Sequence, residues 1–311
     1  MSIQPYIKEI GRGKEGARSL SREQSCDLMG QILDQNITDL EIGAFCLAMR
    51  IKGETPQEMA GFLDAAYARL NYFVYNPTEK AVLIIPTYNG ARRLPVLTPL
   101  LGILLAKEGF PVLMHGSTND NGRISSYSVL KQLGYIAASD SFSLRAGELT
   151  FSPTQLICPP LQKLLDVRQI IGVRNSAHSL VKLLIPVKVK SPTTPNPVLI
   201  TSYTHPEYCV SMRSTLNLTN SNALILRGCE GEPVADARRS PQYTALVNGD
   251  LFFEREAEKG SVAGLHSLST DLTASTVANY TLQMLEGKLP IPKTILDQIE
   301  LIKQVARPQK V

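Results

Sequence analysis

Two polar loops carry residues whose types and spacing are suited to binding an anion. The first lies in the run PTYNGARR, residues 86–93, and follows the apolar residues 81–86. The second begins at His115, after the apolar residues 111–114, and extends to Ser126. Glycine amides, hydroxyls and guanidinium groups at strand ends are typical phosphate ligands. The candidate residues of this anion site are Thr87, Asn89, Gly90, His115, Gly116, Arg123, Ser125 and Ser126.

The elements that must position these loops are alternating strands and helices. We expect strands at 81–86, 111–114, 198–203 and 223–227, with helices at 98–107 and 124–133. This alternation predicts a mostly parallel sheet covered by helices. Because the carboxyl ends of parallel strands meet at one sheet edge, both loops are expected to line a crevice there, the usual ligand position in such sheets. Ser125 and Ser126 also have a simpler interpretation as helix caps.

Other chemical motifs are missing from the sequence. The four histidines lie far apart, and no His-x-x-x-His or Cys-x-x-Cys spacing occurs. The five cysteines are odd in number and widely separated, which predicts neither a disulfide framework nor a zinc site. There is no Gly-x-Ser-x-Gly elbow and no Walker loop. We therefore expect neither a metal nor a cofactor.

Basic residues are concentrated in three segments, although the net charge is only +4. Basic residues outnumber acidic residues five to two over residues 1–22 and six to one over residues 151–200. The last eleven residues contain three basic residues and no acidic residue. A single segment of this kind is most simply a solvated surface, whereas three together indicate a surface for a polyanion. The phosphate contacts expected on this hypothesis are Lys8, Arg12, Lys14, Arg92, Arg93, Arg168, Arg174 and Lys182.

Two domains are expected, an all-helical one over residues 1–75 and a larger α/β one over residues 80–311. The helical prediction rests on three capping-box signatures, each of which opens an apolar-periodic run. These are Ser21 with Gln24, Thr38 with Glu41 and Thr55 with Glu58. Residues 159–185 lack strand signals and are expected to join the helical domain in space. Residues 243–253 are β-like, and two helices are expected to close the chain.

The composition is that of a soluble globular protein, with 43% hydrophobic and 19% charged residues. No run approaches the roughly 18 to 20 apolar residues that a membrane span needs. The first residues also lack the apolar core of a signal peptide. We expect a cytoplasmic protein without a membrane partner.

The order of these segments resembles one enzyme family. Residues 20–62, LSREQSCDLMGQILDQNITDLEIGAFCLAMRIKGETPQEMAGF, are followed by a strand, a short loop and, within residues 114–134, MHG…GRISSYSVLKQLG. Over nearly its whole length the chain resembles anthranilate phosphoribosyltransferase, of glycosyl transferase family 3. The resemblance implies a nucleoside-phosphorylase-like α/β domain and a homodimer formed through the helical domains. It also implies Arg168 as a substrate-carboxylate ligand and Arg123, Ser125 and Ser126 as phosphate ligands.

The residues that this family uses for diphosphate and magnesium are altered here. Its Gly-Thr-Gly-Gly-Asp loop corresponds to Pro-Thr-Tyr-Asn-Gly at residues 86–90, where the acid is missing and proline removes a backbone donor. Met114 stands where the family has the lysine of its Lys-His-Gly-Asn-Arg loop. The paired magnesium ligands align with the Pro-Val pair at 233–234, which cannot bind a metal. Glu230 and Glu232 lie nearby and are the alternative ligands.

A narrower resemblance is carried by IKEIGRGKEGAR, RIKGE, PTYNGAR, GVRNSAHSLVKL and HPEY. These runs resemble the YbiB-type branch of the fold family, whose members are dimeric and bind nucleic acids without sequence preference. The resemblance agrees with the charge distribution, so the main hypothesis is a non-enzymatic protein that binds the DNA or RNA backbone. The alternatives are a phosphoribosyltransferase or phosphorylase acting on another phosphoribosyl substrate, and a small-ligand sensor or scaffold.

Overall fold

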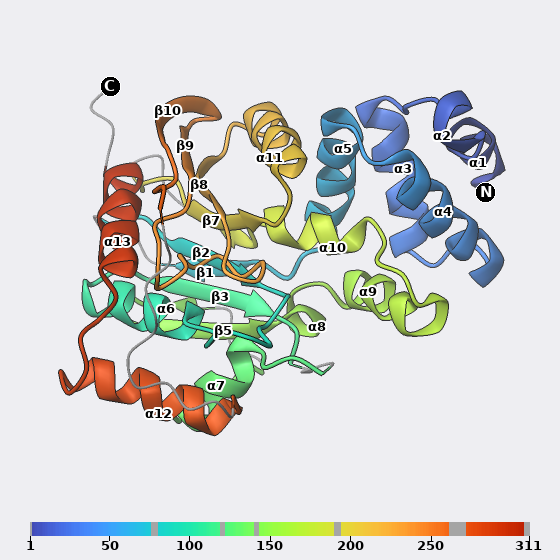
Figure 1. Ribbon diagram of the computed structural model, residues 1–311. Coiled ribbons are helices and arrows are strands. Elements are labelled where there is room, and N and C mark those ends of the chain that lie inside the picture. Colours follow the sequence, from blue (N-terminus) through green and yellow to red (C-terminus); the bar gives the residue numbers. More distant parts are fainter. Residues whose placement is uncertain are drawn as a thin grey trace. The chain divides into compact units, whose positions relative to one another are not determined.

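The computed structural model of the chain describes residues 2–75, 80–118, 122–139, 143–189, 194–260 and 272–307. These residues form two compact units, which Figure 1 shows with the chain coloured from its N-terminus to its C-terminus. The helical unit comprises Met1–Asn71 and Thr154–Pro186, and the α/β unit comprises Tyr72–Pro153 and Val187–Val311. The chain therefore leaves the helical unit, builds part of the α/β unit and returns once.

The helical unit is built from short helices whose starts are fixed by side-chain caps. Its helices are α1 (Gln4–Ile10), α2 (Gly13–Gly16), α3 (Arg22–Leu33), α4 (Asp39–Lys52), α5 (Pro56–Tyr67), α8 (Thr154–Ile157), α9 (Pro159–Ile171), α10 (Ala177–Leu180) and the 3-10 turn η1 (Val181–Leu183). Ser21, Thr38 and Thr55 each form a complete capping box at the start of α3, α4 and α5, as the sequence predicts. Phe45 and Phe62 meet edge to face in the core, with ring centroids 5.9 Å apart.

The central sheet of the α/β unit has seven strands in the order β10-β9-β8-β7-β2-β3-β5. Its strands are β2 (Leu83–Thr87), β3 (Val112–Gly116), β5 (Leu149–Pro153), β7 (Val198–Tyr203), β8 (Asn222–Arg227), β9 (Tyr243–Val247) and β10 (Asp250–Arg255). Pairing is parallel from β8 to β5, and the β9–β10 hairpin adds two antiparallel strands at one edge. Strands β2, β3 and β7 are buried throughout, as is typical of parallel strands covered on both faces. The predicted fold class is confirmed.

Helices cover both faces of this sheet. They are α6 (Thr98–Lys107), α7 (Ser126–Gln132), α11 (Pro206–Leu218), α12 (Ala274–Leu285) and α13 (Lys293–Ala306). In Figure 1, α13 and α11 flank strands β7 to β9 on opposite sides. Leucine and isoleucine side chains of α6 and α13 share one core cluster with β2, β3, β7 and β8.

A second, three-stranded sheet was not expected from the sequence. Its parallel strands are β4 (Ser143–Leu144), β1 (Phe73–Tyr75) and β6 (Val187–Lys188), with β1 in the middle. Strands of two or three residues are too short to show an alternating pattern, and this explains why they escaped prediction.

The topological switch point of the central sheet lies between β2 and β7, because the chain proceeds outward from these two strands in opposite directions, to β3 on one side and to β8 on the other. Strands β2 and β7 pair only through Leu83 and Ile84 and then separate. Pro86, which has no N–H to donate, lies in the part of β2 that no longer pairs with β7.

Candidate functional site

The two predicted loops do meet at the carboxyl edge of the sheet. Strands β2 and β3 run side by side to their ends, where Thr87 pairs with Gly116. Beyond the strands, the amides and carbonyls of Ala91 and Ile124 form a two-bond antiparallel bridge, with N···O distances of 2.9 Å. Thr98 at the start of α6 and Ser126 at the start of α7 lie at the same end of these strands. The place lined by these two residues with Thr87, Asn89 and Gly90 is called the crevice.

The crevice is occupied by a side chain of the protein itself, the carboxylate of Glu232. Its Oε1 accepts hydrogen bonds from the backbone N–H groups of Asn89 and Gly90, at 2.8 and 2.9 Å. Its Oε2 accepts from the hydroxyls of Ser126 at 2.8 Å and Thr98 at 3.2 Å, and also from Thr87. Glu232 is only 1% exposed, and no basic side chain among the described residues forms an ion pair with it. Neutral donors alone therefore hold this buried negative charge.

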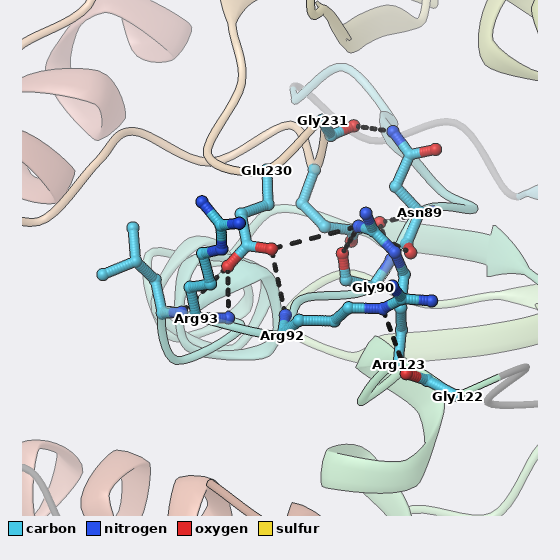
Figure 2. Close-up of polar contacts among 10 residues, drawn as sticks. Asn89, Gly90, Arg92, Arg93, Gly122, Arg123, Glu230 and Gly231 are labelled. Atoms are coloured by element: carbon cyan, nitrogen blue, oxygen red, sulfur yellow. Dashed lines mark hydrogen bonds and ion pairs between the residues drawn. The ribbon is translucent and has the colours of Figure 1, made fainter. Parts of the chain in front are cut away.

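A second carboxylate, that of Glu230, occupies the next stretch of the same loop. Figure 2 shows it facing the amides of Arg92 and Arg93, which donate to its Oε2 at 3.0 Å and its Oε1 at 2.8 Å. The amide of Leu94 also donates to Oε1, at 2.8 Å. The guanidinium of Arg123 is more distant, with Nη1 4.0 Å from Oε2. Three consecutive backbone amides thus converge on one carboxylate, an arrangement that binds anions well.

The segment that carries both glutamates is bent sharply so that they point into the crevice. Glu230 has φ of 50° and Gly231 has φ of 88°, both in the left-handed region. The carbonyl of Gly231 accepts hydrogen bonds from Asn89 Nδ2 at 2.6 Å and from Ser202 Oγ at 2.8 Å. A Cβ at position 231 would collide with the Asn89 amide group, so only glycine fits here.

Most residues of the expected anion site do come together, but their donors are already engaged. Thr87, Asn89, Gly90 and Ser126 all donate to Glu232. In this structure a carboxylate of the same chain, 106 to 145 positions further along the sequence, is their acceptor. That these residues bind an external anion stays a prediction.

The remaining residues of that set have structural partners. Ser125 caps α7 by accepting a hydrogen bond from the Ser128 amide at 3.0 Å, which is the simpler of its two sequence interpretations. His115 is buried, with Nδ1 2.9 Å from the Tyr88 hydroxyl. Arg123 donates through Nη1 to the carbonyl of Gly90 at 3.0 Å, so its guanidinium braces the loop.

The structure also bears on the idea that Glu230 and Glu232 replace missing magnesium ligands. Their four carboxylate oxygens accept from amides and hydroxyls, which are not the surroundings of a free metal ligand. Within the described ranges, no three His, Cys, Asp or Glu side chains lie together as a possible metal site. The neighbouring Cys229 is also not suited to act as a nucleophile. Burial first, and then the negative charges of Asp236 and Glu230, raise the pKa of its thiol to about 12, so the reactive thiolate is disfavoured.

The helical unit carries a basic cluster formed by Arg168, Arg174 and Lys182 around His178. Burial lowers the pKa of His178 to about 4, and the positive charges of Arg174, Arg168 and Lys182 contribute to this shift. Arg168 lies in α9, is exposed, and forms no ion pair with any acid that the structure describes. Arg174 and Lys182 are half-buried. The structure thus brings three of the predicted phosphate contacts together.

The other predicted phosphate contacts are more dispersed. Lys8 is exposed in α1, whereas Arg12 pairs with Glu9 at 2.8 Å and donates to the Lys8 carbonyl at 2.9 Å. Lys14 lies in α2, and its side chain falls outside the described part of the chain. In the α/β unit, the Arg92 and Arg93 side chains are both exposed; Nε of Arg92 donates to the Gly122 carbonyl at 3.1 Å.

Sequence reasoning missed how the crevice is filled. Glu230 and Glu232 were considered only as metal ligands, and Thr98 was not considered at all. The one available signal was an acid on either side of a glycine, Glu-Gly-Glu, following a buried strand. That pattern alone does not reveal which backbone amides the acids will meet.

Comparisons with known proteins agree with this architecture. Residues 4–69 match the glycosyl transferase family helical bundle domain. The chain is 34% identical to YbiB of Escherichia coli (strain K12), over 96% of this chain and 92% of that protein. It is 27% identical to anthranilate phosphoribosyltransferase of Pseudoalteromonas translucida (strain TAC 125), over 93% of this chain and 75% of the enzyme.

The solved structures support the fold. The crystal structure of anthranilate phosphoribosyltransferase from Thermus thermophilus matches with a TM-score of 0.72, covering 96% of this chain and 87% of that chain. Sequence identity in this match is 19%, so the match establishes the fold alone.

Proposed function

The chain belongs to the family of YbiB, and its residues 4–69 match the glycosyl transferase family helical bundle domain. We propose that it binds nucleic acid through the phosphate backbone without reading the sequence. We further propose that it acts in the cytoplasm as a dimer. In the described part of the chain, no helix has both the length and the apolar character to cross a bilayer.

The observation that carries this proposal is the occupied crevice. In a phosphoribosyltransferase, the diphosphate leaving group must be bound and its charge screened. Here the amides of Asn89 and Gly90 and the hydroxyls of Thr87, Thr98 and Ser126 already hold Glu232. A diphosphate entering this place would meet a buried carboxylate, and like charges at close range repel strongly. The geometry therefore disfavours transferase chemistry and favours a role for the outer surface.

Exposed cations support binding of a polyanion. On the helical unit Arg168 is exposed, and the half-buried Arg174 and Lys182 add positive charge near His178, whose pKa is lowered first by burial and then by these charges. Arg93 adds an exposed guanidinium on the α/β unit. Basic side chains that neutralise phosphates release condensed counterions, which gives affinity without sequence preference. Tryptophan is absent from the chain, so we expect backbone contacts rather than base stacking to dominate.

The proposed dimer is supported by an apolar stripe on α4. Leu40, Leu47 and Ile51 are 84%, 50% and 59% exposed. Their spacing of seven and four residues places them on one face of the helix. Exposed large apolar side chains aligned in this way are typical of an interface. A second copy of the chain would cover them, and two basic clusters would then be present in one particle.

Binding is tested by fluorescence anisotropy with a labelled oligonucleotide of random sequence. We expect tight binding near 50 mM salt and a loss of affinity of about three orders of magnitude or more by 200 mM, as for proteins that contact several phosphates. Weak binding even at the lowest salt concentration would refute the proposal.

A matched pair of charge reversals locates the surface. Arg168→Glu should weaken binding to all sequences alike and reduce the slope of log K against log salt by about one unit or more. Arg145→Glu makes the same change of charge at an exposed residue of the α/β unit that was not predicted to contact phosphate. Equal losses in the two variants would show that net charge, and not the basic cluster, determines binding.

Transferase activity is tested by calorimetric titration with phosphoribosyl diphosphate and magnesium. We expect no saturable heat, because the donors in the crevice are engaged. Saturable binding together with release of diphosphate in the presence of an acceptor would establish an enzyme and overturn the proposal.

The dimer is tested by light scattering. Leu47→Glu places a charge in the apolar stripe and should shift the mass from dimer to monomer. Leu282→Glu is the control, because Leu282 is a comparably exposed leucine in α12 of the α/β unit. A monomeric wild-type chain, or a dimer unaffected by Leu47→Glu, would contradict this interface.

A further inference from the structure

The last strand of the central sheet, β10, has a neighbouring strand on one side only, within the described residues. Figure 1 shows it in the hairpin with β9 that ends the sheet. Leu251 and Phe252 of this strand are 45% and 46% exposed. The exposed side chain of Asp250 forms no hydrogen bond or ion pair with any described residue. An open edge strand with exposed apolar side chains is a template for pairing with another strand.

The positions of the β10 side chains are determined by the turn before the strand and by a bulge within it. Asn248 and Gly249 have φ of 51° and 82°, as in a two-residue type I′ turn. A β-bulge at Phe252 inserts one extra residue into β10. Asp250 and Arg255 are five positions apart in the sequence, but their partners in β9 are four positions apart. The bulge therefore places these two opposite charges on the same face of the sheet.

The backbone groups at the open edge of β10 belong to Leu251 and Glu254. A two-residue turn closes on a hydrogen-bonded pair, so Asp250 directs its N–H and C=O groups toward β9. The direction alternates along the strand, and because of the bulge both Leu251 and Glu254 direct these groups away from β9. Two such strands form an antiparallel ladder when Leu251 of one copy meets Glu254 of the other.

We propose that β10 is a docking strand for β10 of a second copy of this chain, paired antiparallel about a two-fold axis at Phe253. In this register each Asp250 lies opposite Arg255 of the other copy, and the two Phe253 side chains face each other. Cross-strand pairs of opposite charge and of aromatic side chains both stabilise antiparallel strands. The same strand is used by both copies, so the contact joins two chains and then closes.

The charges of β10 select this partner and this register. A register centred on Glu254 places two glutamates opposite each other, and like charges in direct opposition destabilise a strand pair. A register centred on Leu251 places Asp250 opposite an aromatic side chain and loses both ion pairs. The Arg255 side chain is 42% exposed and its Nη2 is 3.8 Å from Asp297 Oδ2, so it is accessible to an acid of the second copy.

The contact is small and separate from the apolar stripe of α4. A strand of six residues buries much less surface than the roughly 1,200 Å² of stable interfaces, so the association is weak and transient. The stripe of α4 belongs to the helical unit, whereas β10 belongs to the α/β unit. The β10 contact therefore requires neither the α4 interface nor nucleic-acid binding.

The test is sedimentation equilibrium of the full-length Leu47→Glu variant, in which the α4 stripe is blocked, from about 10 to about 500 µM. We expect one copy at the lowest concentration and an average mass that rises toward that of two copies and not beyond it. Asp250→Arg in this background should weaken the association at least about tenfold, because two opposite-charge pairs become like-charge pairs. Asp250→Ala removes only the attraction and should lie between the two.

A charge swap is the most specific measurement. Arg255→Asp alone should weaken the association, whereas Arg255→Asp combined with Asp250→Arg exchanges the two charges and should restore most of it. Hydrogen exchange at the Leu251 and Glu254 amides should also slow as the concentration of the Leu47→Glu variant rises, because these amides then donate to the second copy. Thermal unfolding midpoints identify the folded variants, and the two Asp250 variants keep the test available if the swap does not fold.

Glu148→Arg is the matched control. It makes the same change of charge at a residue of the α/β unit that is 56% exposed and lies outside β10, and it should leave the association unchanged. The proposal is overturned if the mass of the Leu47→Glu variant does not depend on concentration, or if Asp250→Arg associates as the control does. A folded charge swap that associates no better than Asp250→Arg would overturn it as well.

Discussion

Replacing Glu232 by alanine should destabilise the α/β unit strongly. The change leaves the amides of Asn89 and Gly90 buried without the acceptor that they have at 2.8 and 2.9 Å. An unsatisfied buried donor costs about 1–3 kcal/mol, so two amides amount to roughly 2–6 kcal/mol. The hydroxyl of Thr87 lies 2.6 Å from that of Ser126, so these groups can satisfy each other and add little.

Glutamine at the same position should cost less than alanine. Its carbonyl oxygen can accept from the amides of Asn89 and Gly90, and its NH2 group can donate to the surrounding hydroxyl oxygens. Only the extra strength that the negative charge gives to these hydrogen bonds is then lost. We expect a cost of about 1–2 kcal/mol for Glu232→Gln, and less than about 0.5 kcal/mol for the surface control Glu256→Ala. Urea denaturation followed by circular dichroism gives the three free energies of unfolding.

The order of the three costs is the decisive result. A loss below about 1 kcal/mol for Glu232→Ala would mean that the amides find other partners without difficulty. A larger loss for glutamine than for alanine would mean that the shape of the side chain matters and its hydrogen bonds do not. Either result would refute the view that Glu232 is held as an internal anion.

Two further predictions concern the helical unit. Glu58 is fully buried and accepts a hydrogen bond from Lys52 Nζ at 2.6 Å. Glu58→Ala should lower the free energy of unfolding, measured by urea denaturation, by about 3–5 kcal/mol, because it leaves a buried lysine unpaired. Lys52→Met combined with Glu58→Gln should recover part of this free energy. A small loss for the single variant would contradict this. The pKa of His178 is lowered from 6.5 to about 4, so between these pH values the unfolded chain binds more protons, and stability should fall as the pH falls through this window. The full change in the free energy of unfolding should be about 3 kcal/mol, and unfolding midpoints recorded as a function of pH measure it. His178→Gln should remove this part of the pH dependence, His205→Gln should keep it, and identical profiles for both variants would exclude His178 as the cause.

Much of the fold could be predicted because its signals are local. The three capping boxes concern residues three positions apart, and each forms as expected. The runs expected at 198–203 and 98–107 correspond to β7 and α6. The β-like stretch at 243–253 is the β9–β10 hairpin. In each case, periodicity, caps and breakers within one short segment were sufficient.

The filling of the crevice could not be predicted because its determinants are distant and involve the backbone. The position of the candidate loop followed from the strand before it, whereas the state of its amides depends on a segment that returns about 140 residues later. Pro86 and the loss of loop glycines were visible as departures from a diphosphate site. That Glu232 would take the remaining donors depends on the bend at Gly231, which is a matter of tertiary structure.

The distance along the chain between Glu232 and its donors also bears on folding kinetics. The hydrogen-bond partners of Glu232 lie 106 to 145 positions earlier in the sequence. A carboxylate loses its hydration favourably only when its donors are already in place, so we expect these bonds to form after the sheet edge has been assembled. Contacts that form late leave the refolding rate unchanged and slow unfolding. Loss of the Glu232 carboxylate should therefore speed unfolding of the α/β unit and leave its refolding rate nearly unchanged.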